Sequence, residues 1–236
     1  MRIDPELCVS CGICLVYCPL SAIHMNDVAE IDQETCVECG ACIRAEVCPT
    51  DAFIYEAQPW PRSVREAFSN PLAEHKETRI PGRGTEEMKT NDVRGLFGHG
   101  IIGVAAEVGR PGISCNFHDV ETVTMALAKA GLQFAPENPV TVNMVDKTTG
   151  KINPEIMDER VMSAICEGTI LLDKLADVIK AAKEAAPKID SVFSLEFIDR
   201  PEADRSIPME NILKEQGVAY YPNGKFNLGL GRPLVQ

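Results

Sequence analysis

The chain has 236 residues, a quarter of them charged, and a formal net charge of −12 at pH 7. An acidic balance without a basic cluster argues against nucleic acid as a partner. No apolar stretch approaches the roughly 20 residues that a membrane-spanning helix needs. The first residues carry no apolar run or cleavage site of the kind that marks a secretory signal. We therefore expect a cytoplasmic protein whose cysteines stay reduced.

Eight of the ten cysteines lie in two runs within the first fifty residues, and each run ends in a proline. The runs are Cys8, Cys11, Cys14, Cys18 with Pro19, and Cys36, Cys39, Cys42, Cys48 with Pro49. They belong to a longer repeat, because Ile3-Asp4 before the first run recurs as Ile31-Asp32 before the second. This duplication predicts two halves that pack about a pseudo-twofold axis, each with one metal cluster.

The repeated spacing suits iron–sulfur chemistry, because a 4Fe–4S cluster is held by four cysteine thiolates. Spacings of two residues allow one tight loop to present three sulfurs. Gly12 and Gly40 lack a Cβ, so the backbone can approach a cluster closely. A structural zinc site would also accept four thiolates, but it usually uses two separated cysteine pairs. A disulfide framework would require an oxidising compartment. The pattern favours two 4Fe–4S clusters.

Residues 1–57 resemble the bacterial dicluster ferredoxins, whose C-x2-C-x2-C-x3-C-P spacing the first run reproduces. The resemblance implies that the fourth cysteine of each run ligates the cluster of the other run. The implied ligand sets are Cys8, Cys11, Cys14 and Cys48 for one cluster, and Cys36, Cys39, Cys42 and Cys18 for the other. The chain departs from the family between Cys42 and Cys48, where two extra residues predict a backbone bulge without loss of a ligand.

The negative charge is concentrated in this segment. Residues 1–57 hold ten acidic residues against Arg2 and Arg44, which gives a net charge of −8. An acidic electron carrier is suited to dock on a basic rim around the redox centre of a partner. A solvated surface on a small domain explains the same composition equally well.

Residues 58–84 read as a connector, because four prolines and two glycines interrupt any long element. Within it the sequence predicts a short helix over residues 63–69, ended by Asn70-Pro71. Trp60, the single tryptophan of the chain, is expected to pin the connector against one domain.

Residues 85–236 predict an α+β domain with helices on one face of a sheet. The expected strands cover 101–108, the alternating Val140, Val142 and Met144, and 192–198. The expected helices cover 119–130 with Asp119 as its cap, 154–167, 171–186 and 209–216, followed by a hairpin turn at 220–225. This order fits an α+β sandwich of the ACT or ferredoxin-like kind. The name ferredoxin-like describes a fold here and implies no cluster.

Several polar residues of this domain are candidates for chemistry. Segment 83–92 could form a binding loop with Lys89 as an anion ligand, although the same composition suits a linker. His99, between two glycines, could donate a proton, and a mobile glycine loop is the favoured alternative. Arg110 lies close to Glu107 in the sequence, which favours an ion pair over a catalytic role.

The two remaining cysteines lie outside the runs. Cys115 and His118 could form half of a metal site, but we favour Cys115 as a small core residue and His118 as a residue near a helix start. Cys166 is expected in the core, on the apolar face of a helix.

Stretches 83–92, 107–112 and 119–128 resemble the region after the ferredoxin domain in 6-hydroxynicotinate reductase, a likeness that spans residues 80–165. That family combines iron–sulfur clusters with flavin to reduce an aromatic nitrogen heterocycle. The resemblance implies an electron-feeding module. Since no Gly-x-Gly-x-x-Gly motif follows a predicted strand, nicotinamide binding in this chain is not expected. We also expect the chain to end before any dedicated flavin domain, so that a flavin would lie on a partner.

The sequence thus predicts electron transfer through two 4Fe–4S clusters, in an oxidoreductase component of an anaerobe rather than a self-contained enzyme. The expected partner is a flavo- or metalloenzyme, and a homo- or hetero-oligomer is possible. One alternative is a reductase subunit whose own second domain binds the substrate through Lys89, His99 or Arg110. Another is a ligand-sensing redox regulator with an ACT-like domain.

Overall fold

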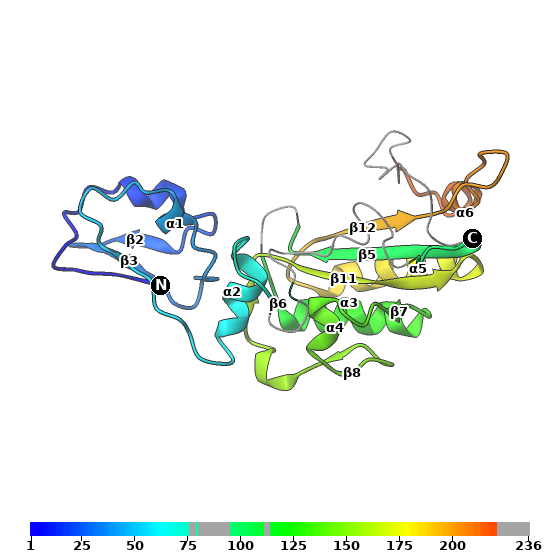
Figure 1. Cartoon of the computed structure of the whole chain (residues 1–236), viewed down its shortest axis with the longest axis horizontal. Coiled ribbons are helices and arrows are strands. Elements are labelled where there is room, and N and C mark those ends of the chain that lie inside the picture. The colour runs from blue at the N-terminus through cyan, green and yellow to red at the C-terminus, as the bar shows by residue number, and fades with distance from the viewer. Residues whose placement is uncertain (76–78, 80–94, 111–113, 221–236) are drawn as a thin grey trace.

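The computed structural model describes residues 1–75, 79, 95–110 and 114–220. Figure 1 shows two parts arranged along the long axis of the molecule. Residues 1–57, here the cysteine-rich part, form one end, and the described residues 95–220, here the sheet part, form the other. Helix α2 (Ser63–Ser69), at the position predicted from the sequence, lies between them.

The cysteine-rich part is built from two similar halves. Strand β1 (Arg2–Ile3) pairs antiparallel with β4 (Phe53–Ile54), and β2 (Ile23–Met25) pairs antiparallel with β3 (Ala29–Ile31). Each half also contains one short helix, η1 (Ile13–Tyr17) in the first and α1 (Ala41–Arg44) in the second. Both helices begin after a glycine in the left-handed region, Gly12 with φ 71° and Gly40 with φ 68°, which side chains with a Cβ rarely adopt.

The sheet part is organised around four antiparallel strands in the order β12-β5-β11-β7. These strands are β5 (Ile101–Val108), β7 (Gln133–Phe134), β11 (Ala164–Leu171) and β12 (Phe193–Ile198). Helix α3 (Phe117–Lys129) joins β5 to β7, and α5 (Leu175–Ala185) joins β11 to β12. This βαββαβ order is that of the split βαβ motif. The predicted α+β class is confirmed, and the ACT assignment stays a prediction.

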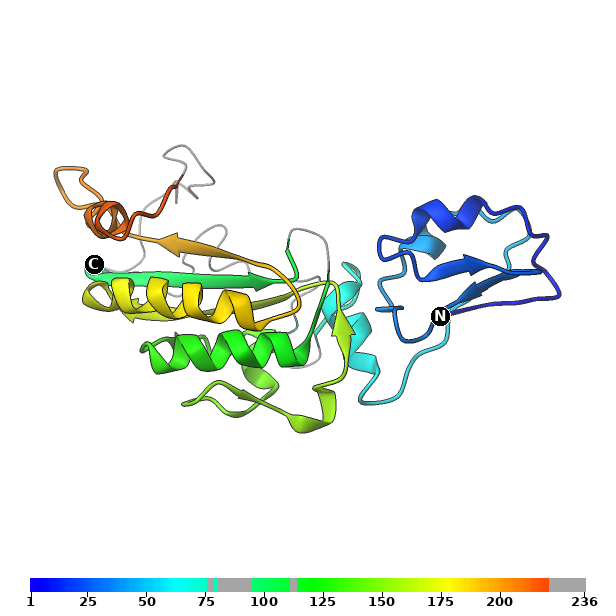
Figure 2. The same cartoon turned by 180° about the vertical axis from the view of Figure 1, so that it is seen from behind.

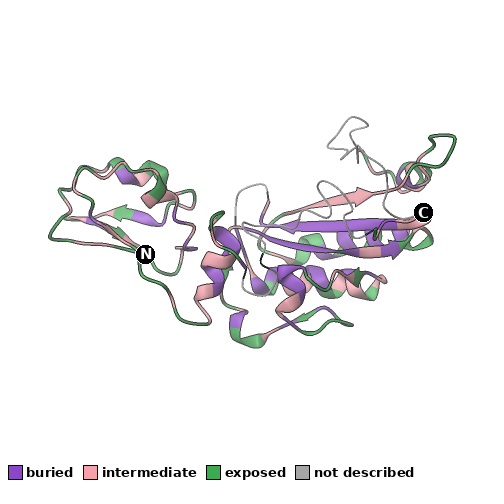
Figure 3. Ribbon diagram, viewed as in Figure 1, coloured by how far each residue is buried: buried purple, intermediate pink, exposed green. Residues whose placement is uncertain are grey.

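Alternation along β5 decides where the core lies. Ile102, Val104, Ala106 and Val108 point to one face of the sheet and are buried in the main core. Helices α3 and α5 cover this face, as Figure 2 shows, and place Val123 and Val178 among others in the same core. Figure 3 shows β5 and β11 buried along most of their length, whereas the cysteine-rich part is mainly half-buried or exposed.

Shorter elements complete the chain. They are β6 (Cys115–Asn116), α4 (Pro139–Val142), β8 (Met144–Asp146), β9 (Lys151–Ile152), η3 (Pro154–Ile156), β10 (Arg160–Val161), η4 (Leu172–Lys174), η5 (Ala186–Lys188) and α6 (Met209–Glu215). Strand β10 pairs with β6, and β8 with β9. The predicted hairpin turn at 220–225 lies almost wholly outside the described residues.

Three local predictions are wrong, each for a physical reason. The expected strand through Val140 and Val142 is the helix α4, because the Asn138 side chain caps it by accepting bonds from the next amides and Pro139 occupies the first turn. The cap of α3 is Asn116, and Asp119 completes a capping box with it from the third helical position.

The third error concerns the helix expected over 154–167. Only the single turn η3 forms at Pro154, and β11 begins at Ala164. All eight residues of β11 pair with β5, and most are buried on both faces of the sheet. A strand buried on both faces shows no alternation of polar and apolar residues, so its sequence resembles a buried helix.

Candidate iron–sulfur sites

The eight cysteines of the cysteine-rich part line two cavities, four to each. Site A is lined by Cys8, Cys11, Cys14 and Cys48, and site B by Cys18, Cys36, Cys39 and Cys42. Counted together with the adjoining open solvent, the empty space is about 360 Å³ at site A and about 380 Å³ at site B. Each site therefore combines three cysteines of one run with the fourth cysteine of the other. The repeat brings the runs together in this way because β1 and β4 join the two ends of the part.

The donor set of each site, four cysteine thiols around one cavity, fits a 4Fe–4S cluster. Within the described ranges, no three His, Cys, Asp or Glu side chains come close enough to hold a single metal ion. A 4Fe–4S cluster differs from one ion because its four thiolates bind four separate irons and so surround a larger volume. The remaining walls are largely apolar and include Ile23 and Val37 at site B and Met25 and Phe53 at site A.

Backbone amides point at the cysteine sulfurs. The N–H of Ala22 donates to Cys18 Sγ at 3.1 Å, and at the equivalent position of the repeat the N–H of Ala52 donates to Cys48 Sγ at 3.3 Å. Burial acts to raise the pKa of Cys48, but the bonds from Ala52 and Thr50 outweigh it and lower that pKa. A lower pKa favours the thiolate, which is the form that binds iron.

Burial raises thiol pKa values at both sites, and at site A it raises the pKa of Cys14. Burial, with a further contribution from the neighbouring Cys39 and Cys36 thiols, raises the pKa of Cys42 to about 11. Burial also raises the pKa of Cys36. Because metal must displace these protons, loading of site B is expected to depend on pH.

Cationic groups lie against the loop of site B. Arg44 Nη1 donates to the carbonyl oxygen of Cys39 at 2.8 Å and to Asn70 Oδ1 at 2.9 Å. Arg65 Nη1 donates to the carbonyl oxygen of Cys36 at 2.9 Å. Sequence reasoning missed both contacts, although the repeat held one signal, since Arg44 occupies the position that Val16 occupies in the first half.

The connector fastens site B to the sheet part. Arg65 is buried, and its guanidinium pairs with the carboxylate of Glu159 while it also donates to the carbonyls of Gln33 and Glu34. The Ser69 hydroxyl accepts from the amide of Met162 at 2.9 Å. The contacts with Glu159 and Met162 join residues 94 and 93 positions apart, whereas those with Gln33 and Glu34 join residues 32 and 31 positions apart.

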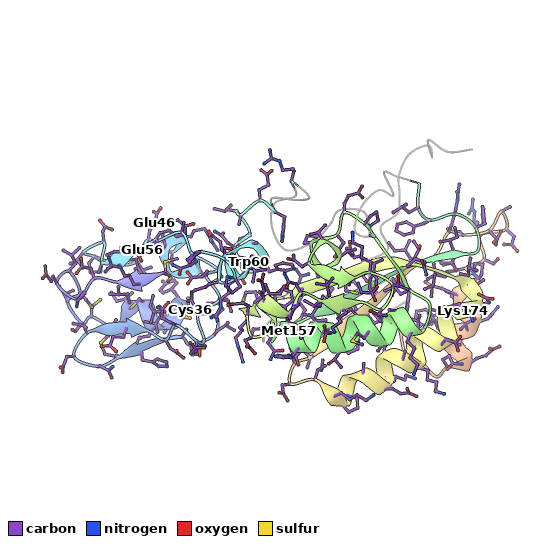
Figure 4. The ribbon with its side chains drawn as sticks, turned by 90° about the horizontal axis from the view of Figure 1, so that it is seen from below. Cys36, Glu46, Glu56, Trp60, Met157 and Lys174 are labelled. Carbon is purple, nitrogen blue, oxygen red and sulfur yellow. The ribbon has the colours of Figure 1, made fainter. Side chains whose placement is uncertain are left out.

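Two further contacts anchor the connector. Trp60 Nε1 donates to Glu155 Oε2 at 2.7 Å, which confirms the predicted pinning role. Figure 4 places Trp60 at the junction, with Cys36 on one side and Met157 on the other. Phe68 packs edge-on against Phe117, with ring centroids 5.3 Å apart, so α2 contributes to the core of the sheet part.

The other predicted polar residues have partners within the protein. Arg110 Nη1 binds both carboxylate oxygens of Glu107, at 3.0 and 2.9 Å, so the favoured ion pair is confirmed. His99 Nδ1 lies 3.3 Å from Glu202 Oε2 on the surface. Lys89 and segment 83–92 lie outside the described residues.

The two remaining cysteines lie in the core, as predicted. Cys115 is buried, and its burial raises the pKa to about 12. His118 instead lies on the surface, with Nε2 3.1 Å from Asp158 Oδ1. Cys166 is fully buried, but on strand β11 rather than on the predicted helix.

Comparison with known families adds one finding. A family model described as a 4Fe-4S dicluster domain matches residues 7–52, a span that includes both cysteine runs. Neither a search of curated proteins nor a search of solved structures gave a match to the chain. In the described part of the chain no helix is long and apolar enough to cross a membrane. The cysteine-rich part is thus a dicluster domain of the ferredoxin type, with two 4Fe–4S clusters as its cofactors and iron–sulfur electron transfer as its activity.

Proposed function

We propose that the chain is the electron-feeding subunit of an anaerobic redox complex, with a flavin or a further metal on a partner protein. The observation that carries the proposal is the pair of four-cysteine sites in one small part, of which site B is fastened through α2 to the sheet part. The sheet part then serves as the docking body for the partner. An isolated carrier would need no such attachment.

The proposal assigns the ligands by site. Cys8, Cys11, Cys14 and Cys48 hold the cluster of site A, and Cys18, Cys36, Cys39 and Cys42 hold that of site B. Each bound cluster accepts and releases a single electron. The protein supplies the thiolates, the amides of Ala22 and Ala52 that stabilise them, and apolar walls that limit water.

The partner is proposed to carry the catalytic centre. His99 and Arg110 each have a carboxylate partner within the chain, which favours a docking role of the sheet part over substrate chemistry by these residues. The resemblance of residues 80–165 to 6-hydroxynicotinate reductase supports a reductase as the partner complex.

Paired substitutions test the ligand assignment. The double variant Cys11→Ser/Cys48→Ser removes two ligands of site A and should keep one intact 4Fe–4S cluster. The double variant Cys11→Ser/Cys18→Ser damages both sites and should lose both clusters. The iron and sulfide content of each variant after oxygen-free purification measures how many clusters it keeps. Equal losses in the two variants would overturn the assignment.

Oxygen-free affinity purification from the native host tests the subunit role. A flavin- or metal-containing protein in stoichiometric amount should accompany the chain, detected by mass spectrometry and a flavin assay. A chain recovered alone, with both clusters loaded, would overturn the electron-feeding proposal and leave the electron-transfer activity of the dicluster domain in place.

A further inference from the structure

We propose that a redox protein with an apolar centre and a basic rim docks on the first half of the cysteine-rich part, over site A. The surface consists of Leu7, Val9, Ile13 and Val16 and is called the site A patch. This inference rests on the proposed electron-feeding function and names the surface through which site A exchanges electrons with that redox protein. The second half and site B then face the sheet part.

The patch is apolar and exposed. Val16 is 84% exposed, Val9 59%, and Leu7 and Ile13 47% each. Large apolar side chains gathered on a surface mark sites of interaction. Val9 and Ile13 also line site A, and Cys11 is itself exposed. A protein that covers this patch would therefore contact the wall of the cluster site directly.

The internal repeat provides a comparison within the same molecule. Val9 corresponds to Val37, which is only 2% exposed, and Ser10 corresponds to Glu38, which is also 2% exposed. The connector covers this second half, because Arg62 pairs with Glu38 at 2.7 Å. At Val37 and Glu38, the chain itself thus covers the positions that stay exposed at Val9 and Ser10 in the first half.

Three acidic residues are connected to the site A patch by adjacency in the chain or by backbone contacts. Glu6 precedes Leu7, and the Leu7 carbonyl accepts a 2.6 Å bond from Thr50, the neighbour of Asp51. The Ser10 hydroxyl, next to Val9, donates a 2.6 Å bond to the carbonyl of Asp27. All three carboxylates belong to exposed residues.

The negative charge of the acidic residues near the site A patch favours a docking protein of opposite charge. An apolar centre within an acidic rim complements an apolar centre within a basic rim. A second copy of the chain would bring the same acidic rim and a net charge of −8 from residues 1–57 against itself, and like charges in contact are repelled. The geometry therefore favours a different protein over a homodimer at this surface.

A kinetic experiment with a defined acceptor tests the patch. The probe is a basic c-type cytochrome, mixed in a stopped-flow instrument with the chemically reduced holoprotein. The double variant Leu7→Ser/Val16→Ser removes apolar contact area but no charge, and neither residue lines site A. The matched control Val145→Ser changes a valine that is 58% exposed on β8 in the sheet part.

The double variant should lower the second-order rate constant for the cytochrome roughly tenfold, since apolar contact of one leucine and one valine side chain is lost. The control should react with the cytochrome as fast as the wild type. The cytochrome rates of all three proteins should fall as salt rises, because salt screens the attraction between opposite charges. Ferricyanide, a small oxidant that needs no docking surface, should oxidise all three proteins at equal rates.

Equal cytochrome rates for double variant and wild type would overturn the docking proposal while leaving the electron-feeding function intact. A parallel loss with ferricyanide would also overturn it, because the substitutions would then act on the cluster site. If the wild-type protein with loaded clusters reduces ferricyanide but not the cytochrome, the proposal that a protein with a basic rim docks on the site A patch is overturned.

Discussion

The guanidinium of Arg44 donates a 2.8 Å hydrogen bond to the carbonyl oxygen of Cys39, which places a positive charge against the loop of site B. Val16 holds the equivalent position in the first half of the repeat and is 84% exposed. The two sites therefore share a ligand pattern but differ in their electrostatic environment. Charge near a cluster is one of the factors that set its reduction potential.

We predict that Arg44→Gln lowers the reduction potential of the site B cluster and that Val16→Arg raises that of the site A cluster. Reduction adds negative charge, which a nearby cation stabilises. A redox titration followed by electron paramagnetic resonance measures both potentials. Arg2→Gln is the matched control, because Arg2 pairs with Glu56 on the surface. A shift of the same size in the control would show a general charge effect instead.

Arg65→Met should destabilise the protein by about 3–5 kcal/mol, the usual cost of breaking a buried ion pair by removing one partner. The variant leaves the Glu159 carboxylate and the carbonyls of Gln33, Glu34 and Cys36 without their cation. The free energy of unfolding in denaturant measures the effect. Arg2→Met, which removes an exposed pair, should cost under about 1 kcal/mol. Equal losses of stability in the two variants would contradict the conclusion that Arg65 fastens site B to the sheet part.

Phe68→Ala should cost about 3–5 kcal/mol in the unfolding of the sheet part, because it empties a buried aromatic position against Phe117. Thermal unfolding followed by circular dichroism reports the loss. Leu72→Ala is the control, since Leu72 is 73% exposed. If the two variants unfold alike, helix α2 does not belong to the core of the sheet part.

Cys115 should resist thiol reagents in the folded holoprotein. With a pKa raised to about 12 by burial, it carries roughly a thousandfold less thiolate at pH 8 than an ordinary cysteine. Its labelling at pH 8 should stay slow until denaturant unfolds the protein, because burial keeps it protonated and away from the reagent. Mass spectrometry of alkylated peptides measures the rate. Labelling of the folded protein as fast as that of the denatured protein would indicate an exposed, ordinary thiol.

Local spacing and periodicity determined much of this protein. The cysteine runs, the helix at 63–69 and the strand at 101–108 could be predicted because each depends on residues close in the chain. The helix that follows residue 171 was predicted as well, although it begins later, at Leu175, after a short turn. Contacts between residues close in the chain depend little on the rest of the fold, so their pattern can be read from the sequence.

Only the tertiary structure decided the rest. Strand β11 forms because β5 pairs with it along all eight residues, and its burial on both faces hides the alternation that identifies a strand. The contacts of Arg65 join residues about 30 and 94 positions away, a separation at which no sequence spacing identifies the partners. The repeat makes the two halves of the cysteine-rich part similar, but only the packing of the connector decides which half is covered and which is left open to a partner.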